Sequence, residues 1–155
     1  MIVQEILTAQ SDAQAELDLI LADLCEMILD GQEKDPDYYG MVAACVIGTK
    51  GQQVCRVNYL REDGTRVHAE RAAIDAYGDV GSDCMIVTTL SPCNQAMDER
   101  HGESCEDLIS SIGIKHVYCG YKDPTQDADA SIETRNPKLR ELCKQFADTF
   151  LKNTP

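Results

Sequence analysis

Two short stretches of the sequence and one later cysteine combine the residue types that bind zinc. His68 is followed two positions later by Glu70, and Cys93 is separated from Cys105 by residues 94–104. A structural zinc site normally has four protein ligands of the imidazole and thiolate type, whereas a catalytic site has three and leaves the fourth position to water. We therefore predict a catalytic zinc site with His68, Cys93 and Cys105 as ligands. Glu70 is the candidate catalytic residue, because a carboxylate at this position can move protons.

The segments around these residues resemble the two zinc motifs of the cytidine deaminase superfamily. The resemblance rests on residues 65–74 and 89–93 and extends from about Met41 to Asp129. It implies an α/β fold with three layers, α/β/α, in which helices flank a central mixed sheet of about five strands. It also implies a zinc-dependent hydrolase that acts on a C–N bond of a cyclic amidine. Such an enzyme replaces an exocyclic amine by a carbonyl oxygen and releases ammonia, with the glutamate transferring protons.

Two branches of the superfamily share features with the chain. The wide separation of the cysteines is similar to the riboflavin-pathway pyrimidine deaminases, as is Asp123-Pro124. Ser91-Pro92-Cys93 and the same Asp123-Pro124 resemble the polynucleotide cytidine deaminases of the AID/APOBEC type. Those enzymes have a tyrosine pair after the fourth strand, where this chain has Cys119-Gly120. The motifs leave the branch open and lower the support for a polynucleotide substrate.

The resemblance also implies where substrate contacts lie. Asn58, ten positions before His68, resembles the asparagine with which many deaminases hold the sugar or base of the substrate. An ordinary turn asparagine explains the same residue equally well. Ala69, Ser91 and Pro92, which adjoin the zinc ligands, are further candidate substrate-binding residues.

A histidine between the two cysteines offers an alternative ligand set. His101 could take the place of Cys105. If both residues bound the metal, four protein ligands would close the site, and the chain would be a noncatalytic binding domain stabilised by zinc. Glu70 argues against this alternative, because a structural site has no use for an acid two residues beyond its histidine.

The charge of the chain bears on its partners. The formal net charge is −13, with 14 Lys and Arg against 27 Asp and Glu. Binding of a polynucleotide relies on clustered cations that release counterions, whereas a nucleotide needs only one or two cations or backbone amides. We therefore expect a small substrate, a free cytosine-type nucleoside or nucleotide, in preference to single-stranded DNA or RNA. The resemblance further implies a homo-oligomer.

Composition also bears on the cellular compartment. The sequence has no apolar run near the ~20 residues that cross a bilayer, and its start has no basic segment before an apolar core. Of the 8 cysteines, those without a predicted metal role fall mostly in apolar stretches, where cysteine behaves as a small buried hydrophobe. These features predict a cytoplasmic protein with reduced thiols and no membrane partner.

Hydrophobic periodicity predicts the elements that position the site. We expect a single deaminase domain over residues 1–155, with the zinc-site core at 41–129. The predicted helices cover residues 11–30, 69–77, 105–112 and 137–152, and the predicted strands cover 41–47, 52–60, 84–90 and 115–121. Residues 122–134 are acidic and predicted as a loop. Alternating helices and strands favour a sheet with parallel strands covered by helices. Both ligand motifs fall at expected helix N-termini, whose dipoles favour the thiolate form of Cys93.

Overall fold

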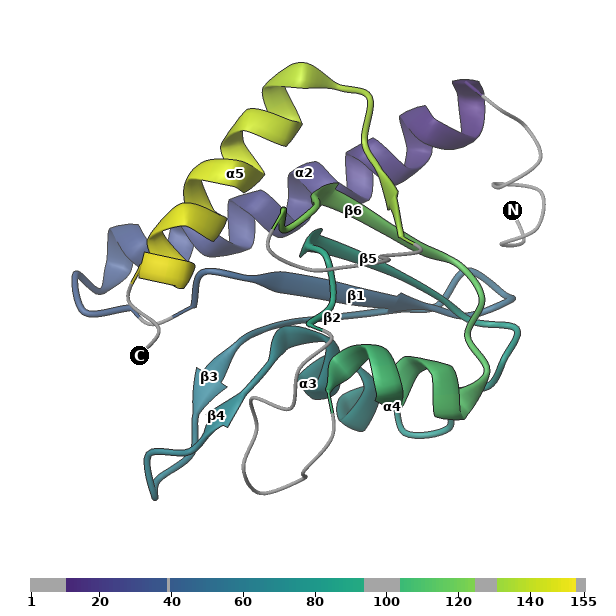
Figure 1. Ribbon diagram of the computed structural model, residues 1–155, viewed down its shortest axis with the longest axis horizontal. Coiled ribbons are helices and arrows are strands. Elements are labelled where there is room, and N and C mark those ends of the chain that lie inside the picture. Colours follow the sequence, from purple (N-terminus) through teal and green to yellow (C-terminus); the bar gives the residue numbers. More distant parts are fainter. Residues whose placement is uncertain (1–10, 39, 94–103, 125–130, 153–155) are drawn as a thin grey trace.

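A five-stranded mixed sheet lies between two layers of helices (Figure 1). The computed structural model describes residues 11–38, 40–93, 104–124 and 131–152. Within them the strand order is β2-β1-β5-β6-β7, antiparallel from β2 to β5 and parallel from β5 to β7. The strands are β1 (Ala43–Ile47), β2 (Gln53–Val57), β5 (Met85–Leu90), β6 (Val117–Tyr121) and β7 (Ile132–Glu133). The predicted three-layer α/β/α fold with a mixed sheet is confirmed.

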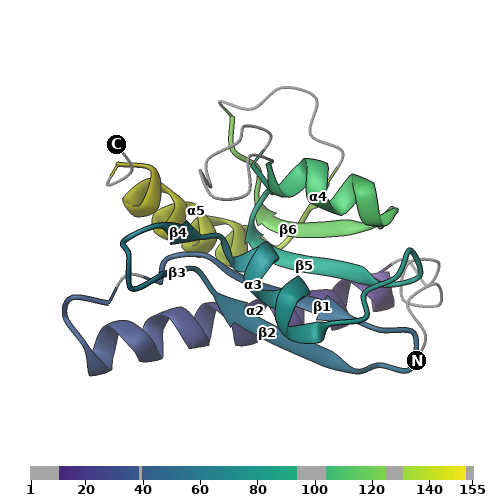
Figure 2. The same cartoon turned by 90° about the horizontal axis from the view of Figure 1, so that it is seen from below.

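The helices cover the sheet in two pairs. α2 (Ser11–Lys34) and α5 (Pro137–Lys152) pack on one face, and α3 (Ala69–Tyr77) and α4 (Cys105–Ile112) pack on the other (Figures 1 and 2). Successive side chains of a strand point to opposite faces, so β5 contributes Met85 and Val87 to the core under α2 and α5, and Ile86 to the core under α3 and α4. The strand is buried along its whole length, and burial on both faces explains why its first three residues are all apolar. None of the described helices has the length and apolar composition of a membrane span.

The helices α3 and α4 have the bounds that the sequence predicts, whereas α2 is longer. The prediction ended this helix at Gly31, but α2 continues to Lys34 and the Gly31 carbonyl accepts a hydrogen bond from the Asp35 N–H at 3.0 Å. A Cβ atom at Gly31 would meet the ring of Tyr38. The glycine thus serves close packing of an aromatic ring against the helix rather than helix termination.

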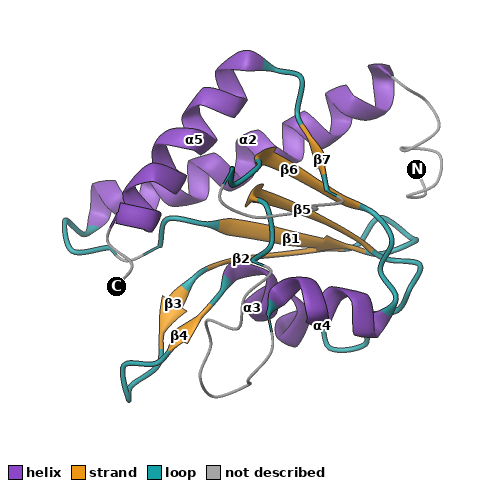
Figure 3. Ribbon diagram, in the orientation of Figure 1, coloured by secondary structure: helices purple, strands orange, loops and turns teal. Residues whose placement is uncertain are grey.

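The predicted strand over residues 52–60 is divided at Asn58. The Asn58 Oδ1 accepts hydrogen bonds from the Met41 N–H at 2.7 Å and the Val42 N–H at 2.8 Å, so the residue joins the end of β2 to the segment before β1. Beyond it, β3 (Tyr59–Leu60) pairs with β4 (Arg66–Val67) in a separate two-stranded sheet (Figure 3). The single long strand was therefore a wrong prediction, because the pattern of alternation does not show where a polar residue redirects the chain.

A second correction concerns the acidic segment before α5. Residues 122–134 were predicted as a loop, yet β7 pairs in parallel with β6, with Ile132 opposite Tyr118. Asp18 of α2 joins the helix to this side of the sheet. It accepts hydrogen bonds from the hydroxyl of Tyr118 in β6 at 2.8 Å and from the hydroxyl of Thr134, just after β7, at 2.6 Å. Two residues of strand carry no detectable periodicity, so only the pairing reveals β7.

The last helix docks closely on β6. Asn136 caps its N-terminus, its Oδ1 accepting from the Lys138 N–H at 3.0 Å. A Cβ atom at Gly120 of β6 would meet the Sγ of Cys143, so the glycine lets α5 lie against the strand. The Cys143 Sγ also lies 3.6 Å from the Sγ of Cys25, which joins α5 to α2. None of the eight cysteines forms a disulfide.

Candidate active site

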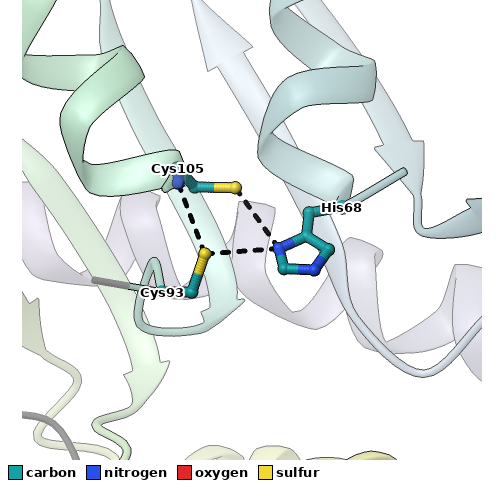
Figure 4. Close-up of side chains that lie close together, drawn as sticks. All are labelled: His68, Cys93 and Cys105. Atoms are coloured by element: carbon teal, nitrogen blue, oxygen red, sulfur yellow. Dashed lines mark hydrogen bonds between the residues drawn. The ribbon is translucent and has the colours of Figure 1, made fainter. Parts of the chain in front are cut away.

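His68, Cys93 and Cys105 converge from three separate elements (Figure 4). His68 is the N-cap residue of α3, Cys105 is the first residue of α4, and Cys93 follows the end of β5 by three positions. The Nδ1 of His68 lies 3.4 Å from the Sγ of Cys93 and 3.4 Å from the Sγ of Cys105. The opposite ring nitrogen, Nε2, is buried. The side chains therefore present one nitrogen and two sulfurs toward a common point.

The spacing of these donor atoms fits zinc. With Zn–N and Zn–S bonds of about 2.0 and 2.3 Å, two ligands of a tetrahedral ion lie about 3.5 Å apart, and the N–S separations here are both 3.4 Å. Among the described residues, no further histidine, cysteine or acid joins this group. The rival ligand His101 lies outside the described residues. The described residues thus supply the three-ligand set typical of a catalytic zinc site.

The two thiols differ in their tendency to ionise. A hydrogen bond from the Cys105 thiol, aided by His68, lowers the pKa of Cys93 to about 4. The same contact, together with burial, raises the pKa of Cys105 well above its usual value. The backbone N–H of Cys105 also donates to the Cys93 Sγ at 3.3 Å. The Cys93 thiolate is therefore stabilised before any metal binds, while Cys105 would lose its proton on binding.

The sulfur of Cys93 faces a helix that begins later in the sequence. The sequence placed Cys93 at the entrance of a helix; the residue itself lies outside the described helices and strands, and residues 94–103 lie outside the described part of the chain. The helix N-terminus that faces its sulfur is that of α4, which begins twelve positions later, at Cys105. The positive end of a helix favours the thiolate, so the expected electrostatic effect arises through space from a different element.

Glu70 is a buried acid in the first turn of α3. Its side chain is 3% exposed, and its Oε1 lies 2.9 Å from the hydroxyl oxygen of Thr88. Burial raises the pKa of Glu70, and the neighbouring His68 opposes this shift in part. A raised pKa brings the charged and neutral forms of the Glu70 carboxyl group closer in free energy near neutral pH. Such a group is suited to accept and return protons.

A pocket that opens to solvent adjoins the candidate metal ligands. The residues that line it are Val42, Asn58, His68, Ala69, Glu70, Leu90, Ser91, Cys93, Asp123 and Phe150. The candidate substrate-binding residues Asn58, Ala69 and Ser91 thus share one pocket with Glu70.

Pro92 does not share that pocket. It lines a neighbouring hollow together with Glu106 and Ile109 of α4. Ser91 and Cys93, on either side of it in the sequence, line the pocket with Glu70. A substrate contact by Pro92 stays a prediction.

Hydrogen bonds hold two of the pocket residues. The Asn58 amide is fixed by its bonds to the Met41 and Val42 N–H groups. The Ser91 hydroxyl accepts from the Asp123 N–H at 2.9 Å, which joins the ends of β5 and β6. The polar wall of the pocket is therefore built on backbone that the sheet holds in place.

Sequence reasoning missed two residues near Glu70. Thr88 looked like an ordinary strand residue, and its bond to Glu70 spans eighteen positions. Phe150 falls in the helix predicted over residues 137–152, and the centroid of its ring lies 6.4 Å from that of the His68 ring, at 84° to it. Helical periodicity identifies the apolar face and gives no signal of which turn reaches the pocket.

Comparison with known proteins identifies the family. The model for the "Cytidine and deoxycytidylate deaminase zinc-binding region" matches residues 22–121, a segment that contains all three candidate ligands and Glu70. The chain belongs to this deaminase family. The zinc-binding character of the family agrees with the donor atoms described above.

Proteins named RibD from two organisms are similar to this deaminase-family chain. The riboflavin biosynthesis protein RibD of Bacillus amyloliquefaciens is 30% identical over 95 residues, which cover 54% of this chain and 24% of that protein. Forms 1 and 2 of Acinetobacter baumannii RibD have TM-scores of 0.64 and 0.63 at 16% and 18% identity. Each match covers 91% of this chain and 40% of the other. The two structures support the deaminase fold, and the chain spans less than half of each relative.

Proposed function

We propose that the chain catalyses the hydrolytic deamination of a small aminated pyrimidine, with a free cytosine-type nucleoside or nucleotide as the first candidate. One observation carries the proposal: Glu70 lines the same pocket as His68 and Cys93, close to a three-ligand metal group. A structural zinc site would have no reason to place a buried acid beside an open pocket.

In this proposal His68, Cys93 and Cys105 would hold the zinc, which when bound would supply Lewis-acid chemistry that lowers the pKa of water to near neutral pH. Glu70 takes a proton from the attacking water and delivers it to the ring nitrogen beside the amine-bearing carbon. It then takes the proton of the new hydroxyl group and gives it to the amine as the C–N bond breaks. The products are ammonia and a ring carbonyl, so atoms and protons balance, and Glu70 ends as it began.

The pocket suits a flat heterocycle that carries a polar substituent. Val42, Leu90 and Phe150 provide apolar surface, while Asn58 and Asp123 provide polar groups. An apolar pocket with a few placed polar groups is typical of small-molecule sites. The Asp123 carboxylate favours a hydrogen-bond donor, such as a sugar hydroxyl or a second ring amine, over a bare phosphate.

The likeness to RibD supports a second candidate, the aminated pyrimidine of the riboflavin pathway. The relative from Bacillus amyloliquefaciens is a riboflavin biosynthesis protein, and the wide separation of Cys93 and Cys105 resembles that branch. Both candidates require the same reaction at an amine-bearing ring carbon, so the test must include both.

A polynucleotide substrate is less favoured. The net charge of −13 opposes a phosphate backbone. Gly120, at the place where the polynucleotide enzymes have a tyrosine, packs against Cys143 of α5 and leaves no room for a side chain.

The decisive experiment is ammonia release by the zinc-loaded protein from cytidine, deoxycytidine, their phosphates, the riboflavin-pathway aminopyrimidine and a cytosine-rich single strand. Glu70→Gln should retain zinc and lose about 10²- to 10⁴-fold in kcat. The control Asp75→Asn removes an exposed acid from the same helix and should leave kcat unchanged. Activity on a nucleoside should hardly respond to salt, whereas activity on a strand should fall steeply. No release from any compound, with zinc bound, would contradict the proposal.

A further inference from the structure

A hydroxyl group from the sheet contacts the candidate catalytic acid. The Thr88 Oγ1 lies 2.9 Å from the Glu70 Oε1 and 2.9 Å from the carbonyl oxygen of Leu90. Thr88 is 0% exposed and Glu70 is 3% exposed. Hydrogen bonds shielded from water in this way are stronger than those at the surface. The contact is therefore able to fix the orientation of the carboxyl group.

Thr88 is the more rigid partner of the two. It lies in β5, where it is paired with Ala44 of β1 on one side and with Cys119 of β6 on the other. Its β-branched side chain has few rotamers available. The longer Glu70 side chain starts from the first turn of α3 and has more rotatable bonds. Thr88 can therefore restrict the orientation of the Glu70 carboxyl group, because its own position is fixed by β5.

The hydroxyl holds only one of the two carboxyl oxygens. A threonine hydroxyl has one proton and two lone pairs, and Thr88 donates to the Glu70 Oε1. The Leu90 carbonyl is a second acceptor at the same distance and keeps the hydroxyl proton on this side of Thr88. The contact engages Oε1 alone, which leaves the second carboxyl oxygen available to the pocket.

We propose that Thr88 is a positioning residue for Glu70. Its hydroxyl fixes one carboxyl oxygen so that the other faces the reacting atoms. The inference rests on the proposed deaminase function for its kinetic consequences, while its structural consequence, the orientation of Glu70, stands independently of any substrate.

The neighbouring residue provides a matched control. Thr89 lies in the same strand, is 1% exposed, and accepts a hydrogen bond from the Ala43 N–H at 3.1 Å. By strand alternation its side chain points to the opposite face of the sheet from Thr88. Thr89→Val removes an equally buried hydroxyl that has no contact with Glu70 among those described.

The test compares Thr88→Val, Thr88→Ser and Thr89→Val in the zinc-loaded protein. Thr88→Val should keep its zinc and its KM and lose about 10- to 100-fold in kcat, because a displaced catalytic group is costly. Thr88→Ser should recover most of this loss. Thr89→Val should lower the melting temperature and leave kcat unchanged. Equal kcat in Thr88→Val and wild type, or an equal fall in Thr89→Val, would overturn the proposal.

A crystal structure of Thr88→Val separates this inference from the proposed function. A reoriented Glu70 carboxyl supports the positioning role even if no compound in the panel is deaminated, in which case only the proposed function fails. An unmoved carboxyl overturns the positioning role even if the enzyme is active. If Thr88→Val does not fold, Thr88→Ala, which removes the same hydroxyl without adding bulk, is examined in the same way.

Discussion

The backbone N–H of Cys105 donates a hydrogen bond to the Sγ of Cys93 across twelve positions of the sequence. The contact places the first residue of α4 directly against the sulfur of a candidate ligand that follows β5. Wide separation of the two cysteines in the sequence is therefore compatible with a compact group of candidate ligands. The same contact joins the start of α4 to this group.

The ligand set is testable by zinc content. Cys105→Ser should lower zinc affinity by more than about 100-fold, because even outer-shell partners of a metal ligand contribute 10- to 100-fold. His101→Ala should retain one zinc per chain. Metal analysis after dialysis against a chelator measures both variants. Retention of zinc by Cys105→Ser together with its loss in His101→Ala would reverse the assignment of the third ligand.

The buried acid should make the metal-free protein sensitive to pH. The fold raises the pKa of Glu70 above its ordinary value of 4.5. Between that value and the raised one, the native protein holds a proton that the unfolded chain has released, so the free energy of unfolding falls as pH rises through this window.

The matching variant for this effect is Glu70→Gln. We expect metal-free Glu70→Gln to be more stable than wild type at neutral pH, with the difference vanishing below the ordinary glutamate pKa. Urea unfolding at several pH values, with chelator present, measures the difference. A stability difference that does not depend on pH would show that burial of the charge is not its source.

The sequence predicted the elements whose apolar pattern is long and regular. α3 and α4 begin and end where the pattern placed them, at Ala69, Tyr77, Cys105 and Ile112. β7 could not be predicted, because a two-residue strand depends on a partner that is remote in sequence. The break at Asn58 was also hidden, because the side-chain bonds that cause it reach back to Met41 and Val42.

Some residues of the candidate site could likewise be predicted from the sequence, and others could not. Residue type and spacing were enough to select His68, Glu70, Cys93 and Cys105, since zinc restricts its ligands to few residue types. The roles of Thr88 and Phe150 could not be predicted, because threonine in a strand and phenylalanine in an amphipathic helix are the usual occupants of such positions. Only their contacts with Glu70 and His68 distinguish them.

Asn58 has a structural task that can be separated from any contact with substrate. Asn58→Ala would leave the N–H groups of Met41 and Val42 without their acceptor and should cost about 1–3 kcal/mol for each one left unsatisfied. Asn58→Asp retains the acceptor oxygen and should keep the fold. Chemical denaturation measures the stability of both, and KM for the substrate measures the contact. A stable Asn58→Asp variant with an unchanged KM would argue against a substrate-binding role.

Gly120 should be intolerant of a side chain. The Cβ of Gly120→Ala would meet Cys143, and such overpacking typically costs about 1–3 kcal/mol. The double variant Gly120→Ala/Cys143→Ala should recover part of this loss, because removing the Sγ relieves the closest contact. Thermal unfolding of the two single variants and the double variant gives the coupling free energy. Strictly additive effects would contradict the contact.

Phe150 should affect substrate binding more than stability. Phe150→Ala removes an apolar wall and should raise KM by roughly 10-fold, as expected for the loss of a few kcal/mol or less of buried apolar contact, while Phe150→Leu should raise it less. The control Thr149→Ala changes an exposed neighbour whose hydroxyl bonds only to the Gln145 carbonyl among the described contacts. Steady-state kinetics on the preferred substrate separate KM from kcat. A large fall in kcat at constant KM would assign Phe150 a different role.

The pocket draws on two unequal parts of the sequence. The candidate ligands and Glu70 all lie within the family-matched segment, residues 22–121, whereas Asp123 and Phe150 lie beyond it. Part of the pocket wall is thus encoded outside the stretch that holds the candidate ligands and Glu70. We expect substitutions at Phe150 of α5 to change which molecule is accepted more than the reaction itself, so this helix is a natural starting point for engineering new substrate preferences.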